Sequence, residues 1–525
     1  MKKSTRNRLT RLGTLSATLL FLHACSIAPE VITPAEQQRI ARADRISAQA
    51  MMAPINAPIT VDEAIARALK YNLDRRTRLM EEAIALNQFD LSQYDMLPRL
   101  VASLGYRDRS EYATARAVDS VTGAPSLANP FISSDKTHTN AELGLTWSLL
   151  DFGLSYYTAK QNADRVLIAS ERRRKAMHLL IQDVRTAFWR TASSQKLRAE
   201  VSKTIAMAEE SLADARKVEE ERLRSPLESL RYQRQLLENI RLLEAIDHEL
   251  SSARTELAHL MNAPLGSDFK VLEPSDSVSR RMLDLPIEQL EEMAVTQNAD
   301  LREQLFNTRI ANEETKKTLL RMFPNLSFNY SLKNDNDRYL VHNQWNEAGT
   351  QLSFNLLNIL SFPAQQKLAQ AGVALADQRR VATQMAVLSQ VHLARLQYAS
   401  SLQQFHRADA IANIDEKISQ QIASREQAQT QSKLDRVTNS TSAILSLLRR
   451  YQALAQVHAS ASKLQATLGM EPKLGSVQDI SLQELTKQIQ LSLSEWNQAN
   501  LNTTGLSINL STSLQIAPTE MKAMK

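Results

Sequence analysis

Four short segments of this 525-residue chain alternate between apolar and polar side chains. They lie near residues 97–107 and 141–151, and again near 323–333 and 349–358. The apolar positions are Leu100, Ala102, Leu104 and Tyr106; Leu143, Leu145, Trp147 and Leu149; Leu326, Phe328, Tyr330 and Leu332; and Leu352, Phe354 and Leu356. A period of two predicts β-strands with one apolar face. The polar positions between them are mostly small and uncharged, which fits either the solvent side of a soluble sheet or the wall of a water-filled lumen.

The segments between these strands contain long stretches without a helix breaker. Neither glycine nor proline occurs between Gly153 and Pro226, or from Val373 to Leu468. A continuous helix of about 70 residues would be roughly 100 Å long. Apolar residues across 236–260 recur at steps of three and four, which predicts the seam of a coiled coil. Taken alone, these helices would also suit a solvated coiled-coil rod.

The chain contains an internal repeat that includes both strand pairs. Residues 59–100 align without a gap on 285–326, and residues 145–151 align on 352–358. Matching residues include Asn72 with Asn298 and Pro98 with Pro324. The repeat predicts two copies of helix, β-hairpin and long helices in one protomer, and hence a mainly α fold with a small β part.

The amino terminus has the features of a secretory signal peptide. Five basic residues precede the apolar run 15–22, which is too short to span a membrane as a helix. The run ends in Leu22-His-Ala-Cys25, which resembles a bacterial lipobox, and lipidation explains a lone cysteine at this place better than redox chemistry does. Residues 1–24 are therefore predicted to be a lipoprotein signal peptide, with Cys25 lipidated, for example by palmitate. Ordinary cleavage after Ala24 is the alternative.

Net charge argues against nucleic acid as a partner. The formal charge of +6 includes the five basic residues of the leader, so the mature chain is left near +1. No apolar run after the leader approaches the length of a spanning helix, so the mature chain could cross a membrane only through strands. Spanning strands must close into a barrel, and the smallest usual barrels need about eight. Four strands per chain therefore predict a homo-oligomer, and a trimer would supply twelve.

Residues suited to catalysis are not grouped in this sequence. There is no glycine-rich phosphate loop, and the histidines lack the i, i+4 pairing of a zinc site. The methionines do not cluster as a soft-metal site. The sequence therefore predicts no enzymatic activity, no cofactor and no metal.

The repeated segments resemble the outer-membrane efflux protein (TolC-like) family. The resemblance is carried by Ile59-Thr-Val-Asp-Glu-Ala-Ile-Ala-Arg-Ala-Leu-Lys-Tyr-Asn72, by the strand start Met96-Leu-Pro98, and by Trp147-Ser-Leu-Leu-Asp-Phe-Gly153, each with a weaker second copy. It covers residues 59–469 and implies a trimer with a twelve-stranded outer-membrane β-barrel, a periplasmic α-helical barrel and a mixed equatorial belt. The second copy departs from the pattern, because the segment 358–363 lacks the glycine that Gly153 supplies in the first.

The resemblance also implies a function, as the exit duct of a tripartite efflux pump of the RND type. Such a duct passively conducts substrates from an inner-membrane transporter and a periplasmic membrane-fusion adapter to the cell exterior. It would be lipid-anchored to the outer membrane, span it as a barrel and extend into the periplasm. Two alternatives stay open: a type I secretion duct, which shares this architecture, and a non-conducting periplasmic coiled-coil lipoprotein, which would have no use for apolar strands.

The functional positions of the family lie at two periplasmic helix-hairpin tips. Residues 222–226 and 433–438 match them, although Arg222 and Lys433 replace a glycine common before the tip leucine. The resemblance makes Leu223, Ser225 and Leu434 candidates for docking the adapter, with simple packing as the alternative for a leucine there.

Two charged residues follow the second tip leucine. Asp435 and Arg436 are candidates for an intersubunit polar network that constricts the closed end of the duct. A solvated charge pair is the alternative for these two residues.

Composition sets the remaining boundaries. The expected parts are a lipid-anchored extended segment at 25–58, a first structural repeat at 59–265, a linker at 266–284, a second repeat at 285–470, and a partly disordered equatorial or C-terminal tail at 471–525 with one amphipathic piece near 482–493. The first interstrand loop, 108–140, is longer than the second, 334–347, and both are expected outside the cell.

Overall fold

The computed structural model of the chain describes residues 31–50, 52–125, 130–221, 225–273, 279–428, 430, 432–472, 474, 477 and 479–497. It divides into two compact units, Met1–Met52 and Ala53–Lys525, each described here by itself. The expected signal peptide, Cys25, Leu223 and the tail beyond residue 497 lie outside the described residues.

In the first unit, the segment expected to be extended contains a helix. α2 spans Pro34–Gln49, and the hydroxyl of its N-cap, Thr33, accepts a hydrogen bond from Glu36 N at 3.2 Å. The expectation of an extended segment rested on its several prolines and its weak periodicity. A proline at the first helical position instead favours a helix start, and no glycine or further proline occurs up to Gln49.

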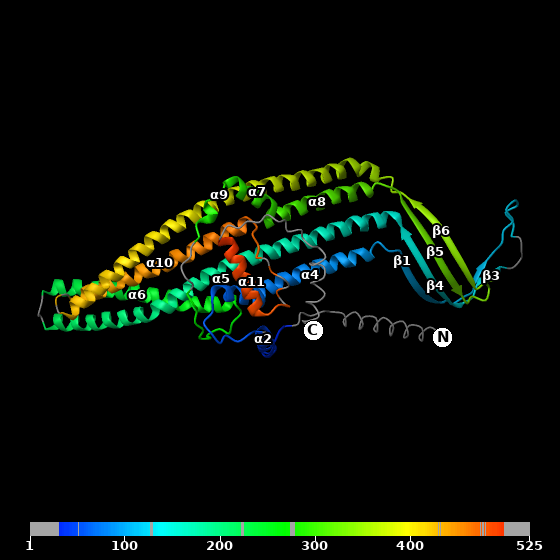
Figure 1. Ribbon diagram of the computed structural model, residues 1–525. Coiled ribbons are helices and arrows are strands. Elements are labelled where there is room, and N and C mark those ends of the chain that lie inside the picture. The colour runs from blue at the N-terminus through cyan, green and yellow to red at the C-terminus, as the bar shows by residue number, and fades with distance from the viewer. Residues whose placement is uncertain are drawn as a thin grey trace, which may run out of the picture. The chain divides into compact units, whose positions relative to one another are not determined.

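The second unit has the internal repeat that the sequence predicts. The first copy comprises α3 (Val61–Tyr71), α4 (Leu73–Tyr94), β1 (Arg99–Asp108), β4 (Thr137–Ser148), α5 (Leu149–Glu220) and α6 (Pro226–Leu260). The second comprises α7 (Ile287–Gln297), α8 (Ala299–Leu320), β5 (Asn325–Asp335), β6 (Gln344–Ser353), α9 (Asn358–Gln427) and α10 (Lys433–Thr467). In Figure 1 the strands lie at one end of this unit, and both helix hairpins, α5–α6 and α9–α10, reach the other end. The repeated helix, hairpin and long-helix pattern is confirmed.

The long helices are continuous and pack along apolar seams. α5 has 72 residues and α9 has 70, so each is roughly 105 Å long at the usual helical rise. The predicted seam of α6 is buried at Leu236, Ile240, Leu243, Ile246, Leu250, Ala253 and Leu257. Within the described part of the chain, no helix combines the length and the apolar character needed to cross a membrane.

An asparagine joins the beginning and the end of each copy. Asn72 caps α4 and donates from Nδ2 to Leu260 O at 3.1 Å. Asn298 caps α8 and donates from Nδ2 to Thr467 O at 2.9 Å. Each asparagine therefore starts one helix and binds a free C-terminal carbonyl of the last helix in its own copy. The two copies therefore share this hydrogen bond as well as the order of their helices and strands.

The four predicted strands form one antiparallel sheet in the order β1-β4-β5-β6. β4 ends at Ser148, because the Ser148 hydroxyl caps α5 by accepting from Asp151 N at 3.1 Å. β6 ends at Ser353, so Phe354 and Leu356 lie beyond the strand. The first loop also contains a small hairpin, β2 (Ala113–Ala115) with β3 (Phe131–Ser134), which the sequence interpretation did not include.

Short elements fill the middle of the second unit. They are the 3₁₀ turn η1 (Arg281–Leu283) and α11 (Leu482–Asn497), which packs against α3.

A buried basic cluster lies between α5 and α10. Arg185 donates to Ser462 Oγ at 2.6 Å and lies 3.2 Å from His458 Nδ1, while His458 stacks on Trp189 with ring centroids 5.0 Å apart. Burial, together with the Arg185 charge, lowers the pKa of His458 to about 3.

Candidate channel wall and helix-hairpin tips

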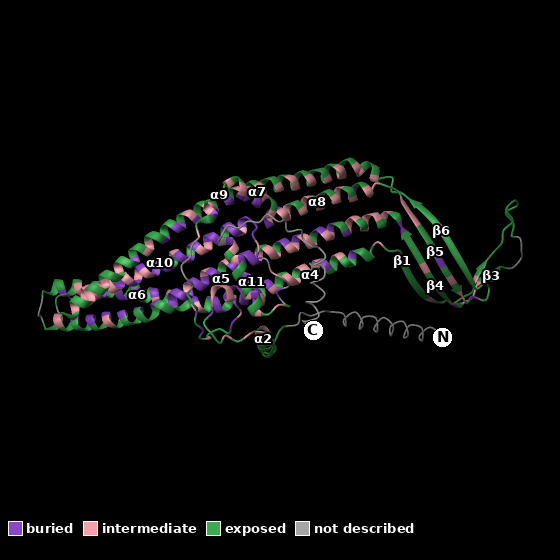
Figure 2. Cartoon of the chain, in the orientation of Figure 1, coloured by how far each residue is buried: buried purple, intermediate pink, exposed green. Residues whose placement is uncertain are grey.

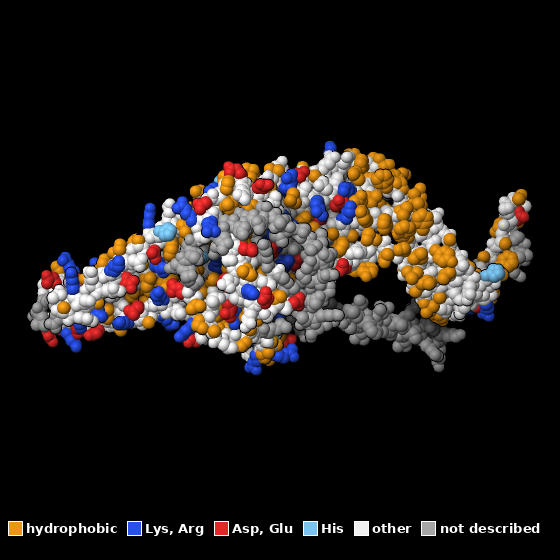
Figure 3. Space-filling model, viewed as in Figure 1, with side chains coloured by type: hydrophobic (Ala, Val, Ile, Leu, Met, Phe, Trp, Pro, Cys, Tyr) orange, Lys and Arg blue, Asp and Glu red, His pale blue; other side chains and the backbone are white. Residues whose placement is uncertain are grey.

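One face of the four-stranded sheet is largely apolar, with at least one leucine from each strand. The strand register pairs Leu100 with Leu145, Leu145 with Tyr330, and Leu326 with Leu352, so these side chains share a face. Leu352 is 70% exposed. Figure 2 shows that most of the sheet is exposed, and Figure 3 shows hydrophobic side chains over it and over the adjoining ends of α8 and α9. An uncovered apolar surface of this kind is typical of a contact with lipid or another chain.

The sheet also has two unpaired edges. β1 and β6 each pair on one side only within the described residues, and each is ten residues long. Long exposed edge strands are templates for pairing with a further chain. Edge-to-edge pairing of several copies would satisfy both edges of every sheet.

The opposite face of the sheet is mostly polar and carries a charged triad. Lys333 Nζ on β5 lies 2.5 Å from Glu347 Oε2 on β6 and 4.0 Å from Glu142 Oε1 on β4. Their side chains are 28%, 52% and 39% exposed, so the triad faces open space. One ammonium is thus shared by two carboxylates from the flanking strands.

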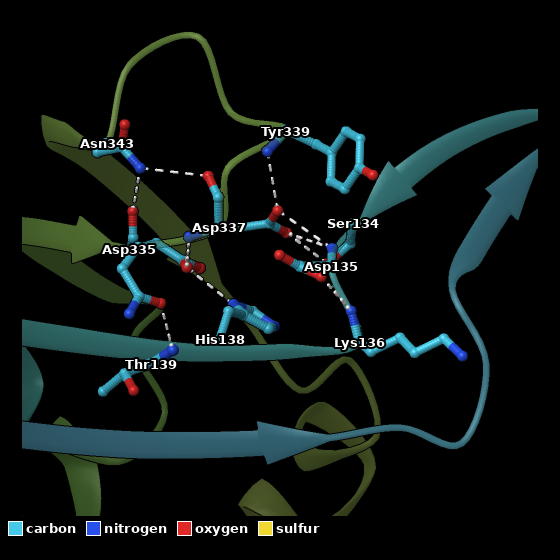
Figure 4. Close-up of polar contacts among 10 residues, drawn as sticks. Ser134, Asp135, Lys136, His138, Thr139, Asp335, Asp337, Tyr339 and Asn343 are labelled. Atoms are coloured by element: carbon cyan, nitrogen blue, oxygen red, sulfur yellow. Dashed lines mark hydrogen bonds and ion pairs between the residues drawn. The ribbon is translucent and has the colours of Figure 1, made fainter.

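A polar cluster ties the two interstrand loops together (Figure 4). Asp337 accepts hydrogen bonds from Ser134 Oγ at 2.5 Å and Asp135 N at 3.1 Å, while His138 Nδ1 lies 2.7 Å from Asp335 Oδ1. Local burial raises the pKa of Asp337, but the hydrogen bonds that it accepts outweigh this and hold the pKa below its usual value. Asp337 therefore stays ionised and anchors the first loop to the second.

The first hairpin tip is the turn between α5 and α6. α5 ends at Glu220 and α6 begins at Pro226, so the predicted tip segment coincides with this turn. Ser225 is exposed and its side chain makes no capping hydrogen bond to α6. Its hydroxyl is therefore accessible to another molecule.

The second tip begins earlier than the sequence predicts. α9 ends at Gln427 and α10 begins at Lys433, so 433–438 forms the first turns of α10 and the connection is 428–432. Leu434 is half-buried and packs on an apolar cluster of Ala208, Leu212, Leu236, Ile240 and Val437. Leu434 therefore packs within its own chain with part of its side chain, and the rest of the side chain is exposed to a possible partner.

Asp435 and Arg436 have partners within their own hairpin. Asp435 N donates to Ser432 Oγ at 3.1 Å, which caps the start of α10, and Ser432 Oγ donates to Asp435 Oδ2 at 2.7 Å. Arg436 pairs with Glu426 on α9 at 2.6 Å across the turn. Both residues therefore stabilise the tip of one chain.

A lysine links the two hairpins near their tips. Lys433 Nζ lies 3.1 Å from Asp214 Oδ2 and 3.2 Å from Glu210 Oε1, both on α5. Hydrogen bonds with Asp214 and Glu210 raise the pKa of Lys433 above its usual value, so the ammonium stays charged. The second hairpin is thereby held to the first.

Sequence reasoning missed the partners in these contacts. Glu210, Asp214 and Glu426 are ordinary charged residues on long polar helices, and only the packing of distant segments reveals what they bind. Glu142 and Lys333 gave a weak signal, since they are among the few charged residues in a mostly small and uncharged set of polar strand positions. No set of three or more potential ligands drawn from His, Cys, Asp and Glu is grouped to hold a metal in the part of the chain that the structure describes.

Comparison with solved structures identifies the fold. The outer membrane channel CmeC of Campylobacter jejuni matches with a TM-score of 0.62 at 12% identity, over 89% of this chain and 97% of that chain. The chain has the TolC-like fold. The open-state outer membrane channel MtrE of Neisseria gonorrhoeae matches with a TM-score of 0.58 at 15% identity, over 78% of this chain and 88% of that chain. A membrane protein from Pseudomonas aeruginosa matches with a TM-score of 0.60 at 16% identity, over 82% and 93% of the two chains.

At these identities the likeness establishes the TolC-like fold and no more. No protein-family model matches the chain, and no curated protein matches its sequence.

Proposed function

We propose that this chain is the outer-membrane exit duct of a tripartite efflux pump. Three copies close their sheets into a twelve-stranded barrel, and their long helices continue the duct into the periplasm. The duct is a passive conduit without enzymatic activity. An inner-membrane transporter and a periplasmic membrane-fusion adapter supply it with substrate.

The observation that carries this proposal is the sheet, with one apolar face and two unpaired edges. Each unpaired backbone group in hydrocarbon costs several kcal/mol, so an open four-stranded sheet is not stable there. Pairing β1 of one copy with β6 of the next removes every edge. The same closure leaves the apolar faces toward lipid and the polar faces toward a lumen.

Exposed apolar residues on α9 support assembly along the helices as well. Ile411, Ile414 and Ile418 recur at steps of three and four, which places them on one stripe of the helix. Ile414 is 57% exposed within a single chain. A stripe of this kind is expected to pack against a helix of a neighbouring copy.

Reconstitution of the purified protein tests the duct. A heat-modifiable trimer that conducts ions in planar bilayers is the expected result. A delipidated protein that stays soluble and monomeric without detergent would reject the duct and favour the non-conducting coiled-coil lipoprotein.

The lipid anchor has a separate test. We infer that Cys25 is lipidated and that the mature protein is held at the outer membrane by this anchor as well as by the barrel. Ser26 follows the cysteine, whereas an aspartate there would, by resemblance to enterobacterial lipoproteins, favour retention at the inner membrane. Mass spectrometry of the mature N-terminus should find an acylated Cys25, and an unmodified Cys25 would reject the anchor.

We further propose that the hairpin tips dock the adapter through Leu223, Ser225 and Leu434. Leu434 packs on its own chain, so Leu434→Asp alone cannot separate docking from folding. Ser225→Arg adds bulk at an exposed position without removing a capping hydrogen bond of α6 and is the sharper variant. Loss of efflux and of adapter cross-linking, with the trimer intact, is expected. Unchanged efflux would reject docking at Ser225.

Efflux and type I secretion use the same architecture. The lipoprotein leader favours efflux by family resemblance. A deletion strain should become more susceptible to toxic small molecules while its secreted proteins stay unchanged. The opposite pattern would support the secretion duct.

A further inference from the structure

The charged triad on the polar face of the sheet is not explained by the need to form a duct. Glu142, Lys333 and Glu347 come from three successive strands, and the two carboxylates share one ammonium. Cross-strand ion pairs add little to sheet stability, about 1 kcal/mol or less each. A neutral pair would serve that purpose equally well, and the second carboxylate leaves each chain with one uncompensated negative charge.

The strand register fixes where this charge lies. Glu142 pairs directly with Ser103 on β1 and with Lys333 on β5. Glu347 on β6 pairs directly with Ser331, which is two residues from Lys333 along β5, so Glu347 and Lys333 are diagonal neighbours on the same face. All of these positions belong to the polar set of alternating residues. In a closed barrel the triad therefore faces the lumen.

Other charges on the polar face of β1 lie farther along the strand. Arg99 and Arg107 are each four residues from Ser103, which is about 13 Å along a strand. This exceeds the Debye length of about 8 to 10 Å at physiological ionic strength. Asp335, the next acidic residue on β5, is bound to His138 at 2.7 Å. The level of the triad therefore keeps a local excess of negative charge.

We propose that Glu142, Lys333 and Glu347 form a selectivity ring that makes the duct favour cationic and neutral solutes over anions. This rests on the proposed duct, because three copies place three triads around one lumen. A ring of carboxylates walled by a low-dielectric barrel raises the local concentration of cations and repels anions. The shared lysine limits the strength of the ring and fixes the positions of the carboxylates.

Zero-current potentials of the full-length trimer in planar bilayers, under a gradient of KCl near physiological ionic strength, test the ring. The wild-type duct should pass potassium over chloride by roughly tenfold. Lys333→Gln should increase this ratio, because both carboxylates then lack a counter-charge. Glu142→Gln with Glu347→Gln should reverse it, because only the ammonium remains.

Two controls separate the ring from general effects. Glu111→Gln removes an exposed carboxylate in the first loop, outside the sheet, and should leave the ratio unchanged. Lys333→Glu with Glu347→Lys keeps the net charge of the triad and should also keep the cation preference.

The outcomes distinguish the ring from the duct itself. Conductance with an unchanged ratio in the Glu142→Gln, Glu347→Gln variant would overturn the ring and leave the duct standing. Absence of conductance in the wild-type protein would overturn the duct and the ring with it.

Discussion

Gly469 ends α10 in a conformation that few other residues adopt. Its φ is +71°, and a Cβ there would overlap the backbone carbonyl of Gln297 at the end of α7. Asn262, at φ +57°, ends the first copy in the same way, just after α6. The close approach of Gly469 to Gln297 brings the end of α10, the last helix of the second copy, against the end of α7, its first helix.

We therefore predict that Gly469→Ala destabilises the protein strongly. Positive φ costs an alanine about 1 kcal/mol, and the overlap with Gln297 adds about 1 to 3 kcal/mol. Gly266→Ala is the matched control, since its φ is +85° and no atom lies within 4 Å of the added Cβ. Thermal unfolding followed by circular dichroism should give a clearly lower midpoint for Gly469→Ala than for the control. Equal midpoints would contradict the packing argument.

Two buried histidines link stability to pH. Burial lowers the pKa of His178 to about 4, and burial with the Arg185 charge lowers that of His458 to about 3. An unfolded histidine has a pKa of about 6.5, so below this pH the unfolded chain binds protons that the folded chain does not. The stabilisation is complete above pH 6.5 and is lost as pH falls through this value toward the folded pKa values.

We predict that the free energy of unfolding decreases by up to about 1.4 kcal/mol per histidine for each pH unit between pH 6.5 and 5. Burial raises the pKa of Asp62, which acts in the opposite direction at lower pH, so this window is the informative one. His458→Gln keeps an acceptor for Arg185 and should remove about half of the dependence, leaving the contribution of His178, as measured by unfolding at a series of pH values. An unchanged pH dependence in this variant would contradict the prediction.

Among the elements, α8 depends on its cap for both its start and its attachment. Asn298 Oδ1 accepts from Asp300 N at 2.9 Å and Leu301 N at 3.1 Å, and Nδ2 holds the end of α10. Asn298→Ala should cost about 2 kcal/mol of unfolding free energy, because it removes the cap and the link together. Asn298→Ser keeps a capping oxygen and loses only the link, so its loss should be smaller. Equal losses in the two variants would show that the cap contributes nothing.

The elements are also where sequence reasoning succeeded most. Alternation identified β1, β4 and β5, but the pattern taken for the fourth strand overlaps only the end of β6, because Phe354 and Leu356 lie beyond Ser353. The absence of glycine and proline identified most of α5 and α9, although Gly153 lies in the first turns of α5 and Pro363 and Gly372 lie near the start of α9. The small hairpin β2–β3 was missed because its strands are only three and four residues long, too short for a period to show.

The contacts at the hairpin tips were harder to predict from the sequence than the helices and strands. The tip segments were located within a few residues by resemblance, but the hydrogen bonds between Ser432 and Asp435 and the pair of Arg436 with Glu426 depend on how one turn folds. The link from Lys433 to Asp214 joins residues more than two hundred positions apart. Such contacts follow from tertiary packing, which no local pattern encodes.

For the whole molecule, assembly is the property that most needs testing. Ile414→Asp places a charge in the exposed stripe of α9 and should cost about 2 kcal/mol or more per interface, because the charge would be buried against a neighbouring copy. Gln420→Asp adds the same charge on the other side of α9 and should be tolerated. Trimer content in cross-linked and detergent-purified samples measures both. A full trimer yield for Ile414→Asp would place the interface elsewhere.

The two unpaired edges of the sheet have a genetic consequence. A barrel that closes only when every copy offers sound β1 and β6 edges fails if a single copy is defective. If sound and damaged chains are made in equal amounts and mix freely, about one assembly in eight contains three sound chains. Alleles that damage either edge but leave the long helices intact should therefore act dominantly, and silence most of the wild-type protein made in the same cell.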